Sequence, residues 1–312
     1  MSKVTKIVLI TAGSLMALGI VLSIIGFVVM RKSVKAATSE PVYEYKEEYV
    51  EETFKNLDLS EVSHNIVFRP SEDGKVKITY FDKDNYNHKI EVANDTLTLT
   101  VKTYDDNSPW WSRFTWHIDL DGIGSTTQDY TTTIYLPEDS YGSLKINTVS
   151  GDVKIPEKYA FDGVGFSTTS GDVEALCTMT GSVNSNTTSG EISFSNLKAS
   201  ELDINTISGN IAVLDSDVTG KSSISVTSGD ITLSKLKTSE LEVNSVSGDV
   251  KLEDLDTNTA EIDTTSGEIT GNIIGDHEYD IDTVSGDIDI PSNVKGQGLI
   301  EVNSVSGDVR LK

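Results

Sequence analysis

Residues 243–250 read VNSVSGDV, and the same eight letters return at residues 302–309. The central Ser-Gly pair, followed by Asp, Glu or Asn, occurs nine times in the 312-residue chain. Its glycines are Gly151, Gly171, Gly190, Gly209, Gly229, Gly248, Gly267, Gly286 and Gly307. Successive glycines lie 19 to 21 residues apart. Self-similarity at such a fixed period is typical of a solenoid, in which each repeat forms one coil.

The residues on either side of each glycine are typical of β-strands. The residue two positions after the glycine is Val or Ile in every copy, and the residue two positions before it is Val, Ile or Thr. Five positions before the glycine the residue is apolar in every copy except one, where it is Ser185. Stiff β-branched side chains suit a pleated surface better than a helix. We therefore predict an all-β fold, a β-solenoid of about 19–20 residues per coil over residues 141–312, with each coil hydrogen-bonded to the next.

The turn and the interior of each coil can also be predicted. The glycine is expected to adopt a positive φ, which a residue with a Cβ would resist. Four positions before it stands Asn, Asp or Ser, and such short side chains are expected to hydrogen-bond along the stack. So small a coil leaves no lumen for a substrate. Cys177, which lies within a coil, is expected to be a buried and inert thiol.

The residue after each glycine is acidic in every copy except the one that carries Asn210. The eight acids are Asp152, Asp172, Glu191, Asp230, Asp249, Glu268, Asp287 and Asp308. Carboxylates stacked about 4.8 Å apart could recruit Ca²⁺ or Mg²⁺ between coils. The alternative is a column of solvated turn residues. We favour the second interpretation and predict no metal and no cofactor, because the calcium-binding pattern of parallel β-rolls is missing.

Residues 54–140 alternate apolar and polar side chains in strand-like fashion but do not follow the repeat. We interpret them as a β-rich lead-in, either irregular first coils or a cap that covers the open end of the solenoid core. The preceding residues 31–53 are polar and show no apolar period, which predicts a juxtamembrane spacer.

Residues 7–30 contain no charged side chain. A helix of this length measures about 36 Å and would cross a hydrocarbon core of about 30 Å. We predict an uncleaved transmembrane helix after a cytoplasmic tail at residues 1–6. The alternative is a signal peptide cleaved after Ala36, but its apolar region would be unusually long. Flanking charges do not orient the helix, since basic residues lie on both sides. The scarcity of Cys and the acidic body favour an extracytoplasmic C-terminal domain on the cell membrane.

Residues 107–122 hold all three tryptophans of the chain. The aromatic and basic side chains gathered there are Trp110, Trp111, Arg113, Phe114 and Trp116. One interpretation is a hydrophobic plug over the end of the solenoid. The other is a ligand-binding platform for a sugar ring, a peptide or a lipid headgroup surface, because Trp combines a large apolar area with a polar handle.

Charge and missing motifs exclude several functions. The first 35 residues hold five basic and no acidic residues, which leaves 20 basic against 49 acidic residues and a formal charge of −29 in the rest of the chain. So acidic a body repels nucleic acid. A single Cys cannot form a disulfide within the chain. The histidines, which are His64, His88, His117 and His277, show no zinc-binding spacing. With no nucleotide-binding or hydrolase motif either, we predict that the protein is not an enzyme.

The order of an N-terminal apolar segment, a β-rich lead-in and repeated (Thr/Val)-Ser-Gly-Asp-(Val/Ile) coils resembles the bacterial "putative adhesin" β-strand-repeat family. Within it, the chain is similar to the LiaG-like membrane proteins of low-GC Gram-positive bacteria. The clearest likeness is residues 133–155, TIYLPEDSYGSLKINTVSGDVKI, together with the eight later coils. The resemblance implies a β-solenoid at the cell envelope and supplies no catalytic residue.

Three functions follow as hypotheses. The first is binding or scaffolding at the envelope, in adhesion or envelope stress, with a protein, a glycan or a cationic peptide as the partner. The second is self-association through the solenoid ends, since the chain stops at Lys312 directly after the ninth motif without a cap. The third is a carbohydrate-active enzyme, which the periodic rather than clustered acids argue against.

Overall fold

The computed structural model describes residues 43–83, 86–102, 130–291 and 298–312, and the regular structure of these residues is entirely β-strand. The first twelve strands are β1 (Glu44–Val50), β2 (Asn56–Ser60), β3 (Asn65–Pro70), β4 (Val76–Asp82), β5 (Asn87–Ala93), β6 (Thr96–Lys102), β7 (Thr131–Leu136), β8 (Ser140–Thr148), β9 (Val153–Ile155), β10 (Ala160–Ser170), β11 (Val173–Ala175) and β12 (Thr178–Met179). The others are β13 (Ser182–Ser189), β14 (Ile192–Ser195), β15 (Lys198–Ala199), β16 (Glu201–Ser208), β17 (Ile211–Ser228), β18 (Ile231–Ser247), β19 (Val250–Ser266), β20 (Ile269–Ile273), β21 (Glu278–Ser285), β22 (Ile288–Asp289), β23 (Leu299–Ser306) and β24 (Val309–Leu311). The described residues lie in one compact unit.

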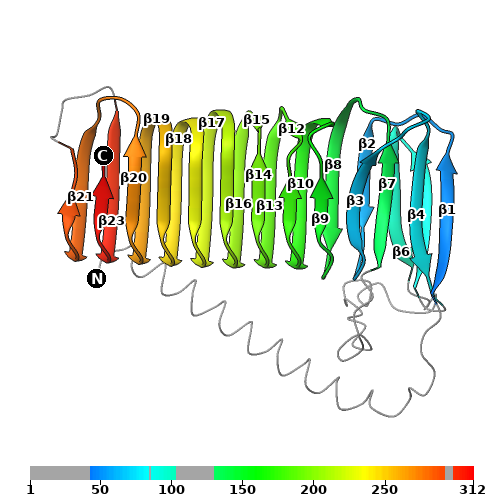
Figure 1. Cartoon of the computed structure of the whole chain (residues 1–312), viewed down its shortest axis with the longest axis horizontal. Helices are drawn as coiled ribbons and strands as arrows, with labels where there is room; N and C mark the ends of the chain where they lie inside the picture. Colours follow the sequence, from blue (N-terminus) through cyan, green and yellow to red (C-terminus); the bar gives the residue numbers. More distant parts are fainter. Residues whose placement is uncertain (1–42, 84–85, 103–129, 292–297) are drawn as a thin grey trace, which may run out of the picture. The chain divides into compact units, whose positions relative to one another are not determined.

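From β8 onward the strands form a parallel β-solenoid, as predicted (Figure 1). Equivalent residues of neighbouring coils pair in register. Ile211 pairs with Ile231 between β17 and β18, and Ile231 pairs with Val250 between β18 and β19. Because the register is kept along the stack, every column of the sequence repeat becomes a line of side chains along the coils.

The glycine column forms the first corner of each coil, and eight of its nine glycines have the predicted positive φ, Gly151 being the exception. Gly229, for example, has a φ of +141°. A Cβ at this residue would lie 2.1 Å from the carbonyl oxygen of Gly209 in the neighbouring coil. The coils therefore approach so closely at this corner that only glycine fits.

A second corner lies six residues after the glycine and uses residues other than glycine. Asn196, Asp215, Lys235 and Asp254 adopt left-handed conformations there, with φ values of 63°, 46°, 51° and 53°. Asn and Asp tolerate this conformation because their short side chains hydrogen-bond locally. The repeat period does not reveal this corner, since its residue type varies from coil to coil.

The core is a continuous stack of inward-facing Val, Ile and Leu side chains with a few aromatic ones near the N-terminal end, such as Phe68 and Phe161. Cys177 is fully buried in it and is not in a disulfide. Burial raises the pKa of its thiol to about 12, so the prediction of a buried, inert thiol agrees with the structure.

The last two coils do not follow the predicted order. Strand β23 pairs with β19 on one side and with β21 on the other, and β24 lies between β20 and β22. The C-terminal coil is therefore inserted between the coil of Gly267 and the coil of Gly286 (Figure 1). The coil at the edge of the described sheet is the one formed by β21 and β22, not the one that ends at Lys312.

Side-chain chemistry gives a physical reason for this order. Ile300, Val302 and Val309 of the inserted coil are completely buried. Residues 278–289 instead carry five acidic side chains. In the middle of the stack, acidic side chains of the coils on both sides would repel them, whereas at the edge a coil lies on one side alone. The inserted coil also brings Arg310 into ion pairs with Glu268 and Asp308. The more polar coil is thus placed at the edge.

The lead-in contains both an irregular first coil and a cap. Strands β2 and β3 pair in parallel with β8 and β9 and extend the solenoid by one coil, and β6 and β7 add parallel strands to them. Strands β1, β4 and β5 pair only in antiparallel fashion and belong to the cap.

Residues 44–50 form strand β1, although we expected them to belong to the spacer at 31–53. This strand lacks an apolar period because it is held by backbone pairing to β4 and by charge. Nζ of Lys46 lies 3.1 Å from Oδ2 of Asp82, and the hydroxyl of Tyr80 donates a hydrogen bond to Glu48. Polar pairs of this kind leave no hydrophobic pattern in the sequence.

No helix among the described residues is long and apolar enough to span a membrane. The predicted transmembrane helix at 7–30 lies outside the described residues.

Candidate functional site

Two exposed columns run beside the glycine corner and form a surface that we call the turn edge. It consists of the β-branched residue two positions before each glycine and the serine directly before it, so it carries no charge in any of the nine coils. Among its β-branched residues, Ile207 is 41% exposed, Val246 37%, Val305 51% and Val284 82%. Regularly spaced, exposed apolar and hydroxyl groups are suited to binding an extended partner.

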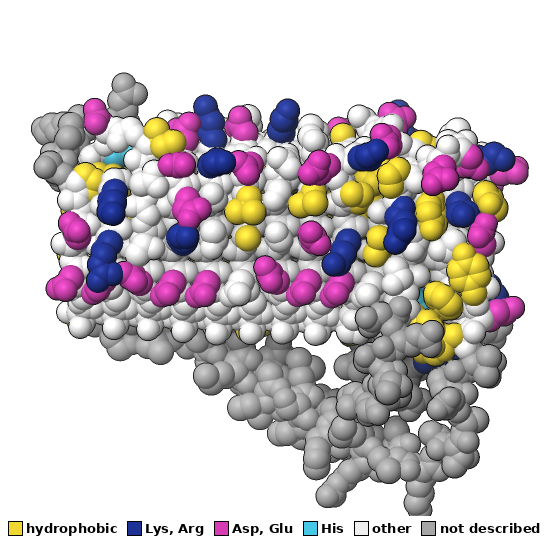
Figure 2. Space-filling view, viewed as in Figure 1, with side chains coloured by type: hydrophobic (Ala, Val, Ile, Leu, Met, Phe, Trp, Pro, Cys, Tyr) yellow, Lys and Arg dark blue, Asp and Glu magenta, His cyan; other side chains and the backbone are white. Residues whose placement is uncertain are grey.

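The acidic column on the other side of the glycine has a structural task. Five of its six Asp residues accept a hydrogen bond from the backbone N–H of the equivalent residue in a neighbouring coil, as Asp230 does from Asp249 at 2.9 Å. Asp152, Asp172 and Asp249 do the same for their neighbours, and Asn210 replaces an Asp in this role. Figure 2 shows a row of acidic side chains along the coils. Within the described residues this column does not bring three possible metal ligands within 4.8 Å of one another.

A column of hydroxyl groups is buried behind the turn edge, three residues before the glycine. The oxygens without a hydrogen-bond partner in this column belong to Thr168, Thr187, Thr206, Ser245, Thr264, Thr283 and Ser304. One coil has Val226 in the same position. The predicted ladder four positions before the glycine is present in part on the outer surface, where Asn205 donates to Asn186 and Asn303 donates to Asp263.

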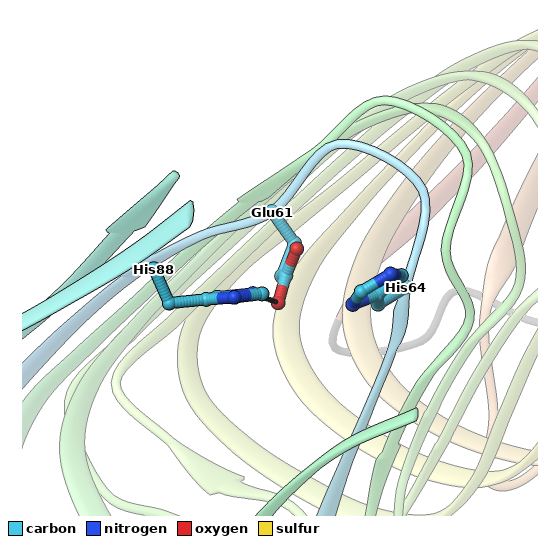
Figure 3. A group of neighbouring side chains, drawn as sticks. All are labelled: Glu61, His64 and His88. Carbon is cyan, nitrogen blue, oxygen red and sulfur yellow. Dashed lines mark hydrogen bonds and ion pairs between the residues drawn. The ribbon is translucent and has the colours of Figure 1, made fainter. Parts of the chain in front are cut away.

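The strongest concentration of chemically active groups lies where the cap meets the first coil. Glu61 and His64 come from the turn between β2 and β3, and His88 comes from β5 (Figure 3). One ligand atom of each residue lies within 4.8 Å of those of the other two. Glu61 is 3% exposed and His64 is 1% exposed, so the cluster is closed to solvent.

Hydrogen bonds hold the cluster from several strands. Nε2 of His88 lies 2.8 Å from Oε1 of Glu61, and its Nδ1 lies 2.7 Å from Asp82. Tyr86 donates to Oε2 of Glu61 at 2.7 Å, and Thr132 donates to Oε1. Both ring nitrogens of His64, in contrast, are buried without a hydrogen-bond partner.

These contacts set the protonation states of the cluster. Burial raises the pKa of Glu61, but its hydrogen bond and charge interaction with His88 outweigh burial and bring the pKa below its usual range. Burial lowers the pKa of His88, but hydrogen bonds to Glu61 and Asp82 outweigh it and raise the pKa. Burial lowers the pKa of His64 to about 4, so this side chain is neutral at pH 7.

The cluster was missed in the sequence because its two histidines are 24 positions apart and have no metal-like spacing. A signal was present, however. Residues 63–67 read SHNIV and align with SGDVK at 150–154, since Ile66 pairs with Val153 and Asn65 accepts a hydrogen bond from the N–H of Asp152. The predicted Trp platform, with Trp110, Trp111, Arg113, Phe114 and Trp116, lies outside the described residues.

These observations define a class of protein, a parallel β-solenoid with an antiparallel β-cap and an exposed, uncharged repetitive edge. Comparison with family models then places it: the chain belongs to the Toastrack DUF4097 family, whose model matches residues 54–234 and 215–312. No curated protein matches the chain.

Solved structures of low sequence identity are similar to this chain. They include a "putative adhesin" from Bacteroides fragilis, with 15% identity, a TM-score of 0.39 and coverage of 89% of this chain and 100% of that one. A "putative lipid binding protein" from Parabacteroides distasonis has 15% identity, a TM-score of 0.34 and coverage of 86% and 94%. A "putative cell adhesion protein" from Clostridium sporogenes has 13% identity, a TM-score of 0.21 and coverage of 88% and 99%. We transfer no property from them at this level of similarity.

Proposed function

We propose that the protein is a non-enzymatic, membrane-anchored extracytoplasmic β-solenoid that binds or scaffolds at the bacterial cell envelope, in adhesion or in the response to envelope stress. The observation that carries this proposal is the turn edge, which repeats one uncharged pattern of β-branched and serine side chains in nine coils. At the coil spacing of about 4.8 Å, such an edge can contact an extended partner at many equivalent points.

The chemistry of the described residues supports a binding role rather than catalysis. The titratable groups Glu61, His64 and His88, which lie together, have buried side chains, so a substrate could not reach them. The nine copies of Ser-Gly-Asp are equivalent turns, whereas a nucleophile needs one specific base. The uncharged segment at 7–30 supports the anchor, and the acidity of the rest of the chain supports an exported domain.

The candidate partners are proteins, glycans and cationic peptides. We would capture partners from intact envelope with the full-length chain and repeat the capture with Val246→Lys and Ile207→Lys on the turn edge. Thr219→Lys, at another exposed position of a coil, serves as the matched control. Loss of captured material in the edge variants alone is expected. Equal capture by all variants would contradict binding at the turn edge.

A second function, self-association, is favoured by the coil at the edge of the described sheet. Among the described residues, strand β21 pairs only with β23, and Val284 and Ile288 in this coil are 82% and 45% exposed. A strand whose outer edge is unpaired can pair with a strand of a second molecule. Light scattering of the full-length chain in detergent tests this: a mass that rises with concentration supports association, and a constant monomer mass rejects it.

A further inference from the structure

The turn between β2 and β3 is a modified copy of the repeat, and its modifications are chemically specific. Backbone pairing aligns β2 with β8, so that Leu57 matches Leu144 and Ser60 matches Asn147. Continuing this alignment, Glu61 stands at the position of the buried hydroxyl column and His64 at the position of the glycine column.

All nine later coils have Ser, Thr or Val at the first of these positions and Gly at the second. Only the first coil replaces both with side chains that bind metals. Glycine is required where a neighbouring coil approaches, as at Gly151, where a Cβ would lie 2.0 Å from the carbonyl oxygen of His64. His64 itself meets the cap rather than another repeat coil. There His88 lies beside it, with ring centroids 5.5 Å apart.

The geometry points to a binding site for a divalent transition metal such as Zn²⁺, formed by Glu61, His64 and His88. Carboxylate oxygen and imidazole nitrogen are ordinary zinc ligands, and bond lengths of about 2.0–2.1 Å place tetrahedral ligands about 3.3 Å apart. The three ligand atoms already lie within 4.8 Å of one another, so small side-chain movements suffice.

Two further observations support a metal rather than a purely structural ion pair. A buried imidazole without partners is costly, and a metal would bind one of the ring nitrogens of His64 that have none. The second nitrogen of His88 lies 2.7 Å from Asp82, which is the carboxylate–histidine arrangement that orients metal-binding histidines. Asp82 is a positioning residue here, and it is itself paired with Lys46 at 3.1 Å.

Such a metal would join two separate parts of the chain. Glu61 and His64 belong to the first coil, whereas His88 lies on a cap strand. The metal would therefore fasten the antiparallel cap to the end of the solenoid, where the repeating coil contacts end. Its role is structural, since the buried site offers no route for a substrate.

The test is metal binding by the full-length chain after removal of metals with a chelator. Titration with Co²⁺, read by the visible absorption of tetrahedral cobalt, and Zn²⁺ content by mass spectrometry should both give one equivalent per chain. His64→Gln and His88→Gln should weaken binding at least 100-fold, and Asp82→Asn should weaken it about 10–100-fold. His277→Gln, which alters a buried histidine far from the cluster in sequence, should bind like the wild-type chain.

Folding controls keep the result decisive. The double variant Glu61→Thr with His64→Gly restores the ordinary repeat pattern, so it should keep the wild-type circular dichroism spectrum while losing the metal. Saturating Zn²⁺ should also raise the unfolding midpoint of the wild-type chain and leave that of the double variant unchanged. Less than 0.1 equivalent of metal in the wild-type chain, or equal binding by the double variant, would overturn the proposal.

Discussion

Replacing Gly229 by alanine should destabilise the solenoid strongly, and the structure gives the size of the effect. The backbone at Gly229 has a φ of +141°, a conformation that costs a residue with a Cβ about 1–3 kcal/mol. The new Cβ would lie 2.1 Å from the carbonyl oxygen of Gly209, well inside ordinary contact distance. Relieving this overlap separates the two coils at their corner.

Two hydrogen bonds would be strained by that separation. Asp230 donates its N–H to Asn210 at 2.9 Å, directly beside the overlapping atoms, and Ile211 donates its N–H to the carbonyl of Asp230 at 2.9 Å. At about 1 kcal/mol for each hydrogen bond, together with the backbone strain, the expected loss is about 3–5 kcal/mol. Distortion of the coils beyond this corner would add to it.

The matched control is Gly165→Ala in another coil. A Cβ at Gly165 meets no atom within 4 Å, and the residue does not have a positive φ. This variant should change stability by less than about 0.5 kcal/mol. Urea unfolding of the full-length chain in detergent, followed by far-ultraviolet circular dichroism, measures both. Equal unfolding midpoints for the two variants would refute the account of the glycine corner.

Three other substitutions test neighbouring columns. Thr206→Val removes a buried hydroxyl that has no hydrogen-bond partner and should stabilise the chain by about 1 kcal/mol in the same urea unfolding experiment. A loss of stability would mean that the hydroxyl is hydrogen-bonded. Asp230→Ala should cost about 1 kcal/mol because the N–H of Asp249 loses its acceptor, whereas Asp230→Asn should cost little; equal losses would contradict the hydrogen-bond role. Burial raises the pKa of Cys177 to about 12 from a usual value near 9. The folded chain therefore favours the neutral thiol, and the free energy of unfolding keeps this contribution below pH 9 and loses it as the pH rises toward 12. A maleimide should therefore label Cys177 at pH 8 only after denaturant unfolds the chain, and rapid labelling of the folded chain would contradict its burial.

The repeat in the sequence was sufficient to predict the coils, because each column performs the same task in every coil. The glycine corner, the β-branched strands and the buried Cys177 all follow from local chemistry at a fixed period. The order of the last coils does not follow from it. Residues 243–250 and 302–309 are identical, so the repeat motif alone does not specify which coil lies beside which; the order depends on side chains outside the motif, such as Arg310.

The candidate sites were predictable to different degrees. The turn edge follows from the serine and β-branched columns, although their exposure requires the structure. The cluster of Glu61, His64 and His88 depends on contacts between the first coil and a cap strand, and such contacts leave no periodic trace. Only the degenerate motif SHNIV at 63–67 indicated that a tenth turn was present.

The central claim is that the protein acts by binding an envelope partner along its turn edge. It is tested most directly by placing a photo-crosslinking amino acid at Val246 on that edge, or at Thr219 on another exposed surface, in the full-length chain inside intact cells. We predict a crosslinked envelope component from position 246 and little or none from position 219. No crosslinked species from position 246, or the same species at equal yield from both positions, would contradict the claim.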